Sequence, residues 1–300
     1  MNRSVVVSGF FADSVQNVGS FEQAIRLIAS CGFYQTAEFY FEGSQADRLK
    51  VKQLLQEYGL SSVFLAGYPM KKNDCHLGDL NDRERQWAIQ QVKQLINQAY
   101  FYGSGKMLIV SGKTYAEPKD RERSIDLLAE SIRELCEYAE LQANGDVLEI
   151  TLEYFNDQGE PHHLLGPTAL SKSFAEQVRD RFGRGFSLTF DLSHAIQLGE
   201  QPEESLQSIA SMTSHIHLAN CVTRYPDDPF YGDKHPPFGW ANSDVNHRYL
   251  RTFVQSLKTV NFQTPITVGV EVITPAGIDR TEALWQATEL FRTALEKLDS

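Results

Sequence analysis

Residues 186–220, FSLTFDLSHAIQLGEQPEESLQSIASMTSHIHLAN, decide the fold. The apolar runs FSLTFDLSHA (186–195) and SHIHLAN (214–220) are typical of buried strands, and SLQSIA (205–210) between them is typical of a short helix. A strand, a helix and a second strand in this order predict two parallel strands joined by a helical crossover. Asp191 and His217 lie near the carboxyl ends of these two strands, where parallel barrels keep their chemistry.

The same alternation continues in both directions from this segment. Near-continuous apolar runs of this kind fit a parallel sheet that is covered on both faces. Eight strands that alternate with helices predict a closed (β/α)8 barrel, and we expect residues 1–300 to form one domain. No GxGxxG follows the first strand, so a dinucleotide-binding sheet has little support. The other six strands are expected at RSVVVSGF (3–10), TAEFYF (36–41), SSVFLAGYP (61–69), KMLIVSGK (106–113), DVLEITLEYF (146–155) and PITVGVEVI (265–273).

One helix start has a recognisable capping pattern. Ser20 is followed three residues later by Gln23, which is the spacing of a capping box. The apolar positions beyond it have helical spacing, and Gly32 lies where a helix would stop. The pattern therefore predicts a helix that begins at Ser20.

Composition excludes several classes of partner. The chain is 42% hydrophobic and 22% charged, as expected for a globular protein with a full core, and no apolar run approaches the roughly 20 residues of a membrane span. A net charge of −11 without a long Lys/Arg cluster repels phosphate, so we expect no nucleic-acid partner. Four cysteines without a CxxC pair favour free thiols in a reducing cytoplasm. The amino terminus lacks the layout of a signal peptide.

Four potential ligands fall at the ends of strands five to eight: Glu153, Asp191, His217 and Glu271. A closed parallel barrel would gather them at its carboxyl rim. Neighbouring buried carboxylates repel one another unless a cation compensates their charge. Three carboxylates and an imidazole suit a hard or borderline divalent cation, so we predict that they hold one Mn, Mg, Co or Zn ion.

Other side chains near these strand ends have competing interpretations. His194 follows Asp191 by three residues and is expected to bind a substrate hydroxyl, to bind a second metal or only to start a helix. His215 shares a face with His217 but lies deeper, as a hydrogen-bonded core residue. Lys113 ends strand four and is a Schiff-base candidate or a surface lysine. Glu38 either lines the pocket or forms an ion pair in the barrel floor. Candidates for apolar walls around a sugar are Phe10, Tyr68, Phe238 and Trp240.

The ligand set resembles that of the xylose isomerase-like barrel superfamily, which includes sugar-ketose 3-epimerases, hydroxypyruvate isomerases, inosose and dehydroshikimate dehydratases and endonuclease IV-type enzymes. LEYFN resembles the LExxN strand end of the epimerases, which implies that Glu153 is the metal-binding catalytic glutamate and that Asn156 is its neighbouring asparagine. DLSH resembles their DxxH, and Glu271 resembles the fourth ligand.

Two features separate this chain from the epimerases. Gln158 stands where they carry a second acidic residue, and Thr223 stands where they place an arginine, with Arg224 one residue further on. GDKHPPFG resembles the DxH of a third metal site in endonuclease IV-type enzymes, through Asp233 and His235. The two earlier histidines of that family have no counterpart in LAGYP and LIVSGK, so a three-metal cluster is not expected. The resemblance implies substrate contacts from His194, His235, Asn156, Arg224 and Asp233.

These residues together predict a metal-dependent isomerase or epimerase that acts on a ketose or a related hydroxy-carbonyl compound. Glu153 and Glu271 would transfer the proton through an enediolate, with the cation as Lewis acid. Three alternatives stay open: a dehydratase of a keto-polyol on the same fold, an endonuclease IV-like phosphodiesterase, and a barrel that binds a sugar without turnover. The expected partner is a small carbohydrate or polyol, and the sequence leaves open whether the chain forms a homo-oligomer.

Overall fold

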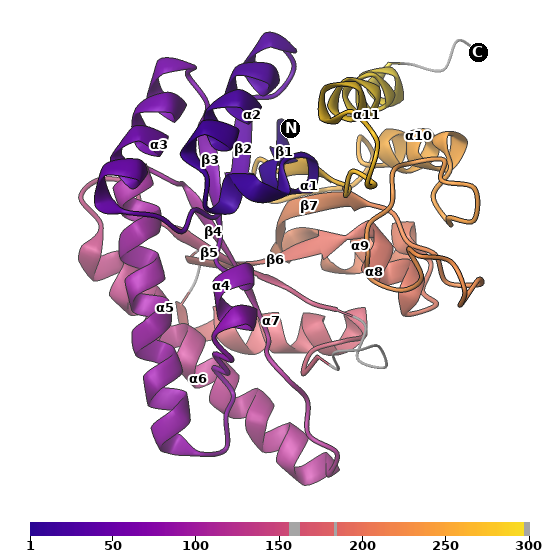
Figure 1. Ribbon diagram of the computed structural model, residues 1–300. Helices are drawn as coiled ribbons and strands as arrows, with labels where there is room; N and C mark the ends of the chain where they lie inside the picture. The colour runs from indigo at the N-terminus through magenta and orange to yellow at the C-terminus, as the bar shows by residue number, and fades with distance from the viewer. Residues whose placement is uncertain (156–162, 183–184, 297–300) are drawn as a thin grey trace.

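The computed structural model describes residues 1–155, 163–182 and 185–296 (Figure 1). Within these residues, eight parallel strands pair in sequence order and β8 pairs back onto β1. The predicted closed (β/α)8 barrel is therefore confirmed. The strands are β1 (Asn2–Val6), β2 (Thr36–Phe39), β3 (Ser61–Leu65), β4 (Lys106–Val110), β5 (Glu149–Glu153), β6 (Phe186–Asp191), β7 (Thr213–Ala219) and β8 (Thr267–Glu271).

Helices form the outer layer of the barrel, and successive long helices pack side by side, as α5 and α6 do in Figure 1. Short helices α1 (Val7–Phe10), α4 (Gly67–Lys72) and α8 (Leu192–Gln197) follow β1, β3 and β6 directly, in addition to the strict alternation that the sequence predicted. The outer helices are α2 (Val18–Ser30), α3 (Gln45–Glu57), α5 (Asp82–Tyr102), α6 (Pro118–Gln142), α7 (Thr168–Phe182), α9 (Pro202–Ile209), α10 (His247–Ser256) and α11 (Arg280–Leu295).

The predicted start of α2 at Ser20 is wrong. The helix begins at Val18, and Asn17 is its N-cap, because the Asn17 side chain accepts from the backbone N–H groups of Gly19 and Ser20. Ser20 donates its hydroxyl to Asp13 at 2.8 Å instead. Asparagine and serine are equally good caps, so the tertiary contact to Asp13 decides between them.

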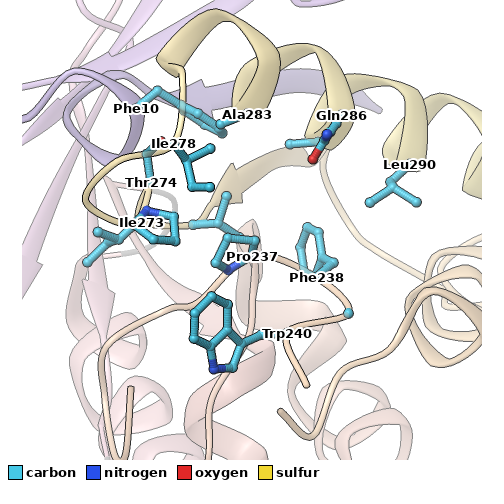
Figure 2. Close-up of a pocket in the computed structure, with 14 residues that line it drawn as sticks. Phe10, Pro237, Phe238, Trp240, Ile273, Thr274, Ile278, Ala283, Gln286 and Leu290 are labelled. Carbon is cyan, nitrogen blue, oxygen red and sulfur yellow. The ribbon is translucent and has the colours of Figure 1, made fainter. Parts of the chain in front are cut away.

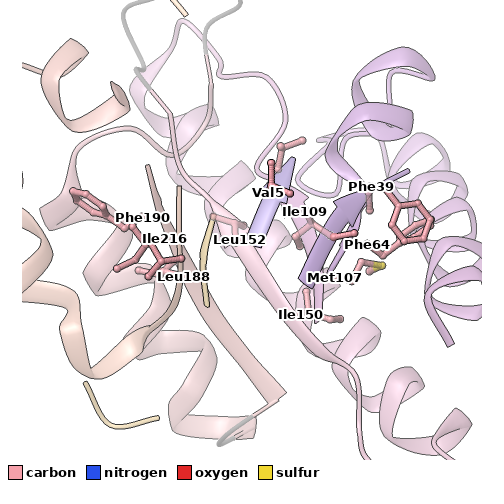
Figure 3. Close-up of a cluster of buried hydrophobic side chains, with 14 of the residues drawn as sticks. Val5, Phe39, Phe64, Met107, Ile109, Ile150, Leu152, Leu188, Phe190 and Ile216 are labelled. Carbon is pink, nitrogen blue, oxygen red and sulfur yellow. The ribbon is translucent and has the colours of Figure 1, made fainter. Parts of the chain in front are cut away.

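The two faces of the barrel strands differ in polarity. Outward-facing side chains such as Leu152, Phe190 and Ile216 are fully buried and apolar (Figure 3). Inside the barrel, polar groups hydrogen-bond to one another across the strands, including the Thr151 and Thr189 hydroxyls at 2.8 Å. Charged side chains at the strand ends therefore lie next to a hydrogen-bonded polar interior and not against an apolar one.

Two further expectations from composition concern the whole chain. The four cysteines are buried with free thiols, as the absence of a CxxC pair predicted. Within the described residues, no helix has both the length and the hydrophobicity that a membrane span requires.

Candidate metal centre

The four predicted ligands meet at the carboxyl rim of β5 to β8. Each of Glu153, Asp191, His217 and Glu271 offers one ligand atom within 4.8 Å of the others. The Nδ1 atom of His217 lies 2.6 Å from Glu271 Oε2, 3.1 Å from Glu153 Oε1 and 3.9 Å from Asp191 Oδ2. One imidazole nitrogen therefore faces three carboxylates. Glu271 has the most exposed side chain of the four, at 24%, and lies toward solvent.

Strand register explains this convergence. Asp191 pairs with His217 across β6 and β7, whereas Glu153 pairs with Thr189, two residues earlier in β6. Glu271 pairs with Ala219, two residues beyond His217. Residues two apart point to the same side of a strand, so all four side chains face the barrel axis.

Asp191 divides its two oxygens between structure and site. Oδ1 caps α8 by accepting from the backbone N–H groups of Ser193 at 2.7 Å and His194 at 3.1 Å, and it also accepts the Ser193 hydroxyl at 2.6 Å. Its other oxygen, Oδ2, is buried and has no hydrogen-bond partner among the described residues. The helix cap thus holds the carboxylate in one orientation, with Oδ2 directed at His217 Nδ1.

The chemistry of these atoms fits a divalent cation. Oδ2 of Asp191 and Oε2 of Glu271 are buried and, within the described part of the chain, accept no hydrogen bond; the 2.6 Å contact from His217 to Glu271 lacks hydrogen-bond geometry. A desolvated carboxylate oxygen without a partner is costly, and a cation bound between the four residues would satisfy both oxygens. Three carboxylates and an imidazole are suitable ligands for Mn²⁺, Zn²⁺, Co²⁺ or Mg²⁺.

In this cluster, a proton on His217 supplies the positive charge that a bound cation would otherwise supply. Burial disfavours a charged imidazole, but the carboxylates of Glu271 and Glu38 outweigh it and raise the pKa of His217 well above its ordinary value. Burial would raise the pKa of Glu271, but the charges of His217 and His235 lower it to about 2. Without a cation, the site therefore holds an imidazolium at His217 next to the ionised carboxylate of Glu271.

A second group of potential ligands borders the first. Asp233 Oδ1 lies 3.1 Å from His194 Nε2 and 2.6 Å from His235 Nε2, and His235 Nδ1 lies 3.7 Å from Glu271 Oε2. His194 donates its Nδ1 proton to the Tyr154 carbonyl at 3.1 Å. His235 has a φ of 44°, a left-handed backbone that few non-glycine residues adopt and that recurs at active sites and ligand-binding positions. The structure thus brings together His194, Asp233 and His235, for which the sequence left open substrate contacts or a second metal; both roles stay predictions.

This second group is also charged. Burial opposes protonation of His194, but Asp191 and Asp233 raise its pKa to about 9. Burial likewise opposes protonation of His235, and the carboxylates of Glu271 and Asp233 raise its pKa to about 10. The two imidazolium charges overcome the effect of burial on Asp233 and hold its pKa well below the usual range. At neutral pH both rings therefore carry a hydrogen on each nitrogen. His194 donates to Tyr154 and Asp233, whereas His235 donates from Nε2 to Asp233 and has its Nδ1 3.7 Å from Glu271 Oε2.

Two residues with predicted or considered roles, Arg224 and Lys113, lie elsewhere, and a third is not among the described residues. Arg224 is not brought into either group: its side chain is 69% exposed and its Nε pairs with Asp244 at 3.3 Å. Asn156 lies outside the described residues. Lys113 is 57% exposed and pairs with Asp74 at 2.9 Å, which favours the surface lysine over a Schiff-base nucleophile.

An apolar pocket of about 210 Å³ is lined mainly by residues that follow His235 and Glu271 in the sequence. It lies between α11, the segment after β8 and residues 237–240 (Figure 2). It is lined by Phe10, Phe238 and Trp240, three of the aromatic residues that the sequence suggested as walls. Ile273 in its lining donates its backbone N–H to the His235 carbonyl at 2.7 Å. Tyr68, the fourth candidate, is 51% exposed and lies against Tyr40 instead.

Sequence reasoning left the place of Glu38 undecided. Glu38 is completely buried in β2, and its carboxylate contacts His215 and His217 on the opposite side of the barrel. His215 lies deeper than His217 and is hydrogen-bonded, as predicted. A glutamate inside the short apolar run TAEFYF was the available signal, but its partners are 177 and 179 residues away.

Comparison with known proteins then places the chain. A family model described as a xylose isomerase-like TIM barrel matches residues 25–298. The chain belongs to this family. Its membership confirms the resemblance that the ligand motifs suggested. A search of curated proteins gave no match.

Solved structures of this family share the whole fold at low sequence identity. An L-ribulose 3-epimerase has a TM-score of 0.76 at 14% identity, covering 98% of this chain and 95% of its own. A D-tagatose 3-epimerase-like protein has a TM-score of 0.70 at 17% identity and covers 98% of both chains. The IOLI protein, solved with a bound zinc atom, has a TM-score of 0.68 at 15% identity and also covers 98% of both.

Proposed function

We propose that this protein is a divalent-metal-dependent isomerase or epimerase of a ketose or a related hydroxy-carbonyl carbohydrate. The observation that carries the proposal is the meeting of Glu153, Asp191, His217 and Glu271 around two buried carboxylate oxygens that lack partners within the described residues. Support comes from the names of similar structures, which include two sugar-epimerase descriptions and a protein with bound zinc.

The two glutamates are suited to opposite halves of a proton transfer. When bound, a divalent cation would act as a Lewis acid and stabilise the negative charge that proton removal leaves on substrate oxygens. Glu153 ends β5 and Glu271 ends β8, so the two carboxylates approach the mouth from the two ends of the four-strand arc. One would remove the proton next to the carbonyl, and the other would return it.

The second group would orient the substrate. The imidazole of His235 would donate from Nδ1 to a substrate hydroxyl or carbonyl oxygen, while Asp233 holds the ring by accepting from its Nε2 atom. His194, whose Nδ1 donates to the Tyr154 carbonyl, would contact the substrate through Nε2 by exchanging Asp233 for a substrate oxygen. Asn156, after strand five, is a further proposed substrate contact. Arg224, after strand seven, is also proposed, but it would have to leave Asp244 to reach the substrate.

An endonuclease IV-like phosphodiesterase is the second candidate. The convergence of His194, Asp233 and His235 favours it, since these three could hold an additional cation. The net charge of −11 weakens it, because a DNA substrate requires a favourable electrostatic surface.

The test is solvent exchange. Metal-loaded protein would be incubated in D₂O with a panel of ketoses and keto-polyols, and deuterium next to the carbonyl would be followed by NMR. We expect incorporation with at least one substrate, and a loss of about 100-fold or more in Glu153→Gln and Glu271→Gln. Glu22→Gln, on the outer face of α2, is the matched control and should retain full exchange.

Each other outcome selects a different function. Loss of water from the substrate would identify a dehydratase. Cleavage of abasic-site DNA together with more than one bound cation per chain would identify the phosphodiesterase. Binding of a sugar without exchange or elimination would leave a non-catalytic barrel.

A further inference from the structure

A buried carboxylate occupies the barrel interior directly beneath the candidate metal centre. Glu38 in β2 is 0% exposed and accepts three hydrogen bonds. Its Oε1 accepts from the Ser4 hydroxyl and from His215 Nε2 at 3.1 Å, and its Oε2 accepts from His217 Nε2 at 3.0 Å. An ionised carboxylate that is buried away from water needs hydrogen-bond donors, and here both oxygens of Glu38 have at least one.

The two nitrogens of His217 therefore face different partners. Nε2 faces Glu38, and Nδ1 faces the carboxylates of Glu153 and Glu271. An ionised carboxylate can only accept, so the nitrogen next to Glu38 must carry a hydrogen. A neutral imidazole has one N–H hydrogen, and with that hydrogen on Nε2 the lone pair lies on Nδ1, toward the metal centre.

We propose that Glu38 is a positioning residue that fixes the tautomer and ring orientation of His217, so that Nδ1 is the atom presented to the cation. This inference rests on the proposed metal function of His217. Carboxylates that accept from the second nitrogen of a ligand histidine orient the ring, and their loss typically weakens metal binding by about 10- to 100-fold.

Glu38 itself has little freedom to move. A Cβ atom on Gly269 of β8 would lie 2.1 Å from Glu38 Oε1, so the carboxylate fits against bare backbone at this position. His215 holds the same oxygen, and its own Nδ1 lies 3.1 Å from the Thr189 hydroxyl, which donates to it. The position of the Glu38 carboxylate is therefore fixed by contacts from β1, β7 and β8 that do not involve His217.

Glu38→Gln is the sharpest test, because it keeps the shape and replaces one acceptor oxygen with an N–H₂ donor. Ser4 and His215 both donate to the Oε1 position, so the amide oxygen is expected there and the N–H₂ group toward His217. His217 would then have to accept at Nε2, which places its hydrogen on Nδ1, where the cation should bind. Zn²⁺ affinity, measured by competition with a chromophoric chelator, should fall about 10- to 100-fold.

Thr189→Val is the matched control. It removes a hydroxyl from the same buried network, at His215, but leaves the contact between Glu38 and His217. We expect its Zn²⁺ affinity to stay close to that of the wild type. An equal loss in both variants would overturn the proposal, since general disturbance of the interior would then explain the effect. Unchanged affinity in folded Glu38→Gln would overturn it as well.

A direct reading of the tautomer needs no variant and stays informative if Glu38→Gln does not fold. Long-range ¹H–¹⁵N NMR of the zinc-loaded wild type distinguishes an Nδ1-bound from an Nε2-bound imidazole. We expect His217 to bind through Nδ1 and to retain its Nε2–H. Binding through Nε2 would refute the role of Glu38, whereas failure of the wild type to bind any cation would refute the proposed function instead.

Discussion

His217 Nδ1 lies 2.6 Å from Glu271 Oε2, and the same nitrogen lies within hydrogen-bond distance of Glu153 Oε1 at 3.1 Å. In the absence of a cation, the hydrogen bond to the Glu153 carboxylate, which can only accept, requires a hydrogen on Nδ1. A cation that binds there must displace it, so metal and proton compete for one atom.

Metal affinity should therefore rise with pH. The carboxylates around His217 raise its pKa well above the ordinary value, so the imidazole is charged at neutral pH and must lose a proton on binding. We expect the affinity for Zn²⁺ or Mn²⁺ to increase about tenfold per pH unit between pH 6 and 8. Calorimetry in buffers of different ionisation enthalpy would count the released protons. An affinity that is constant across this range would contradict the competition.

Two substitutions of Asp191 should separate its role as the cap of α8 from its role as a metal ligand. Asp191→Asn keeps an oxygen that can cap α8 but places an amide where Oδ2 stood, so metal affinity should fall while thermal stability changes little. Asp191→Ala removes the cap too and should cost about 1 kcal/mol more in the free energy of unfolding. Chemical denaturation of both metal-free variants makes the comparison. Equal stabilities would show that the cap contributes nothing.

The metal-free protein should lose stability as the pH rises above neutrality. Buried His194 and His235 have pKa values raised by neighbouring carboxylates to about 9 and about 10, against 6.5 as the ordinary value. Their contribution is complete below pH 6.5 and disappears as the pH passes through 9 and 10. Melting temperatures of metal-free protein from pH 6 to 10 test this, with His235→Asn as the variant expected to flatten the upper part of the curve. A wild-type curve that rises over this range would refute it.

Metal stoichiometry should decide what the second group does. We expect one divalent cation per chain by elemental analysis, lost in His217→Ala and retained in His235→Asn, which should instead weaken substrate binding. Two cations in the wild type and one in His235→Asn would make His194, Asp233 and His235 a second metal site. The comparison is informative because Asp233 links the imidazoles of His194 and His235 and, within the described residues, makes no hydrogen bond to His217.

The sequence predicted the barrel and the members of the four-residue cluster because both depend on local patterns. Glu153, Asp191, His217 and Glu271 each close or nearly close an apolar run, and a parallel barrel places the ends of such runs at one rim. Their roles as ligands and acid–base groups stay predictions. Nothing local could place Glu38 under His217, because its two histidine partners come from β7, 177 and 179 residues away in the chain.

Loop side chains and helix caps were harder to predict. The spacing that suggested Arg224 as a substrate contact fixes its distance along the chain but not the direction of its side chain, which pairs with Asp244. Asn17 and Ser20 have similar capping chemistry, and only the fold reveals that Asp13 accepts the Ser20 hydroxyl.

The division of labour within Asp191 has a consequence for ion selectivity. Because Oδ1 is committed to the start of α8, Oδ2 cannot move outward to suit a larger ion without uncapping that helix. A ligand set that cannot expand should select bound cations by their ionic radius. It should discriminate against Ca²⁺, which prefers longer bonds and a looser, more crowded shell of oxygens, in favour of smaller divalent ions.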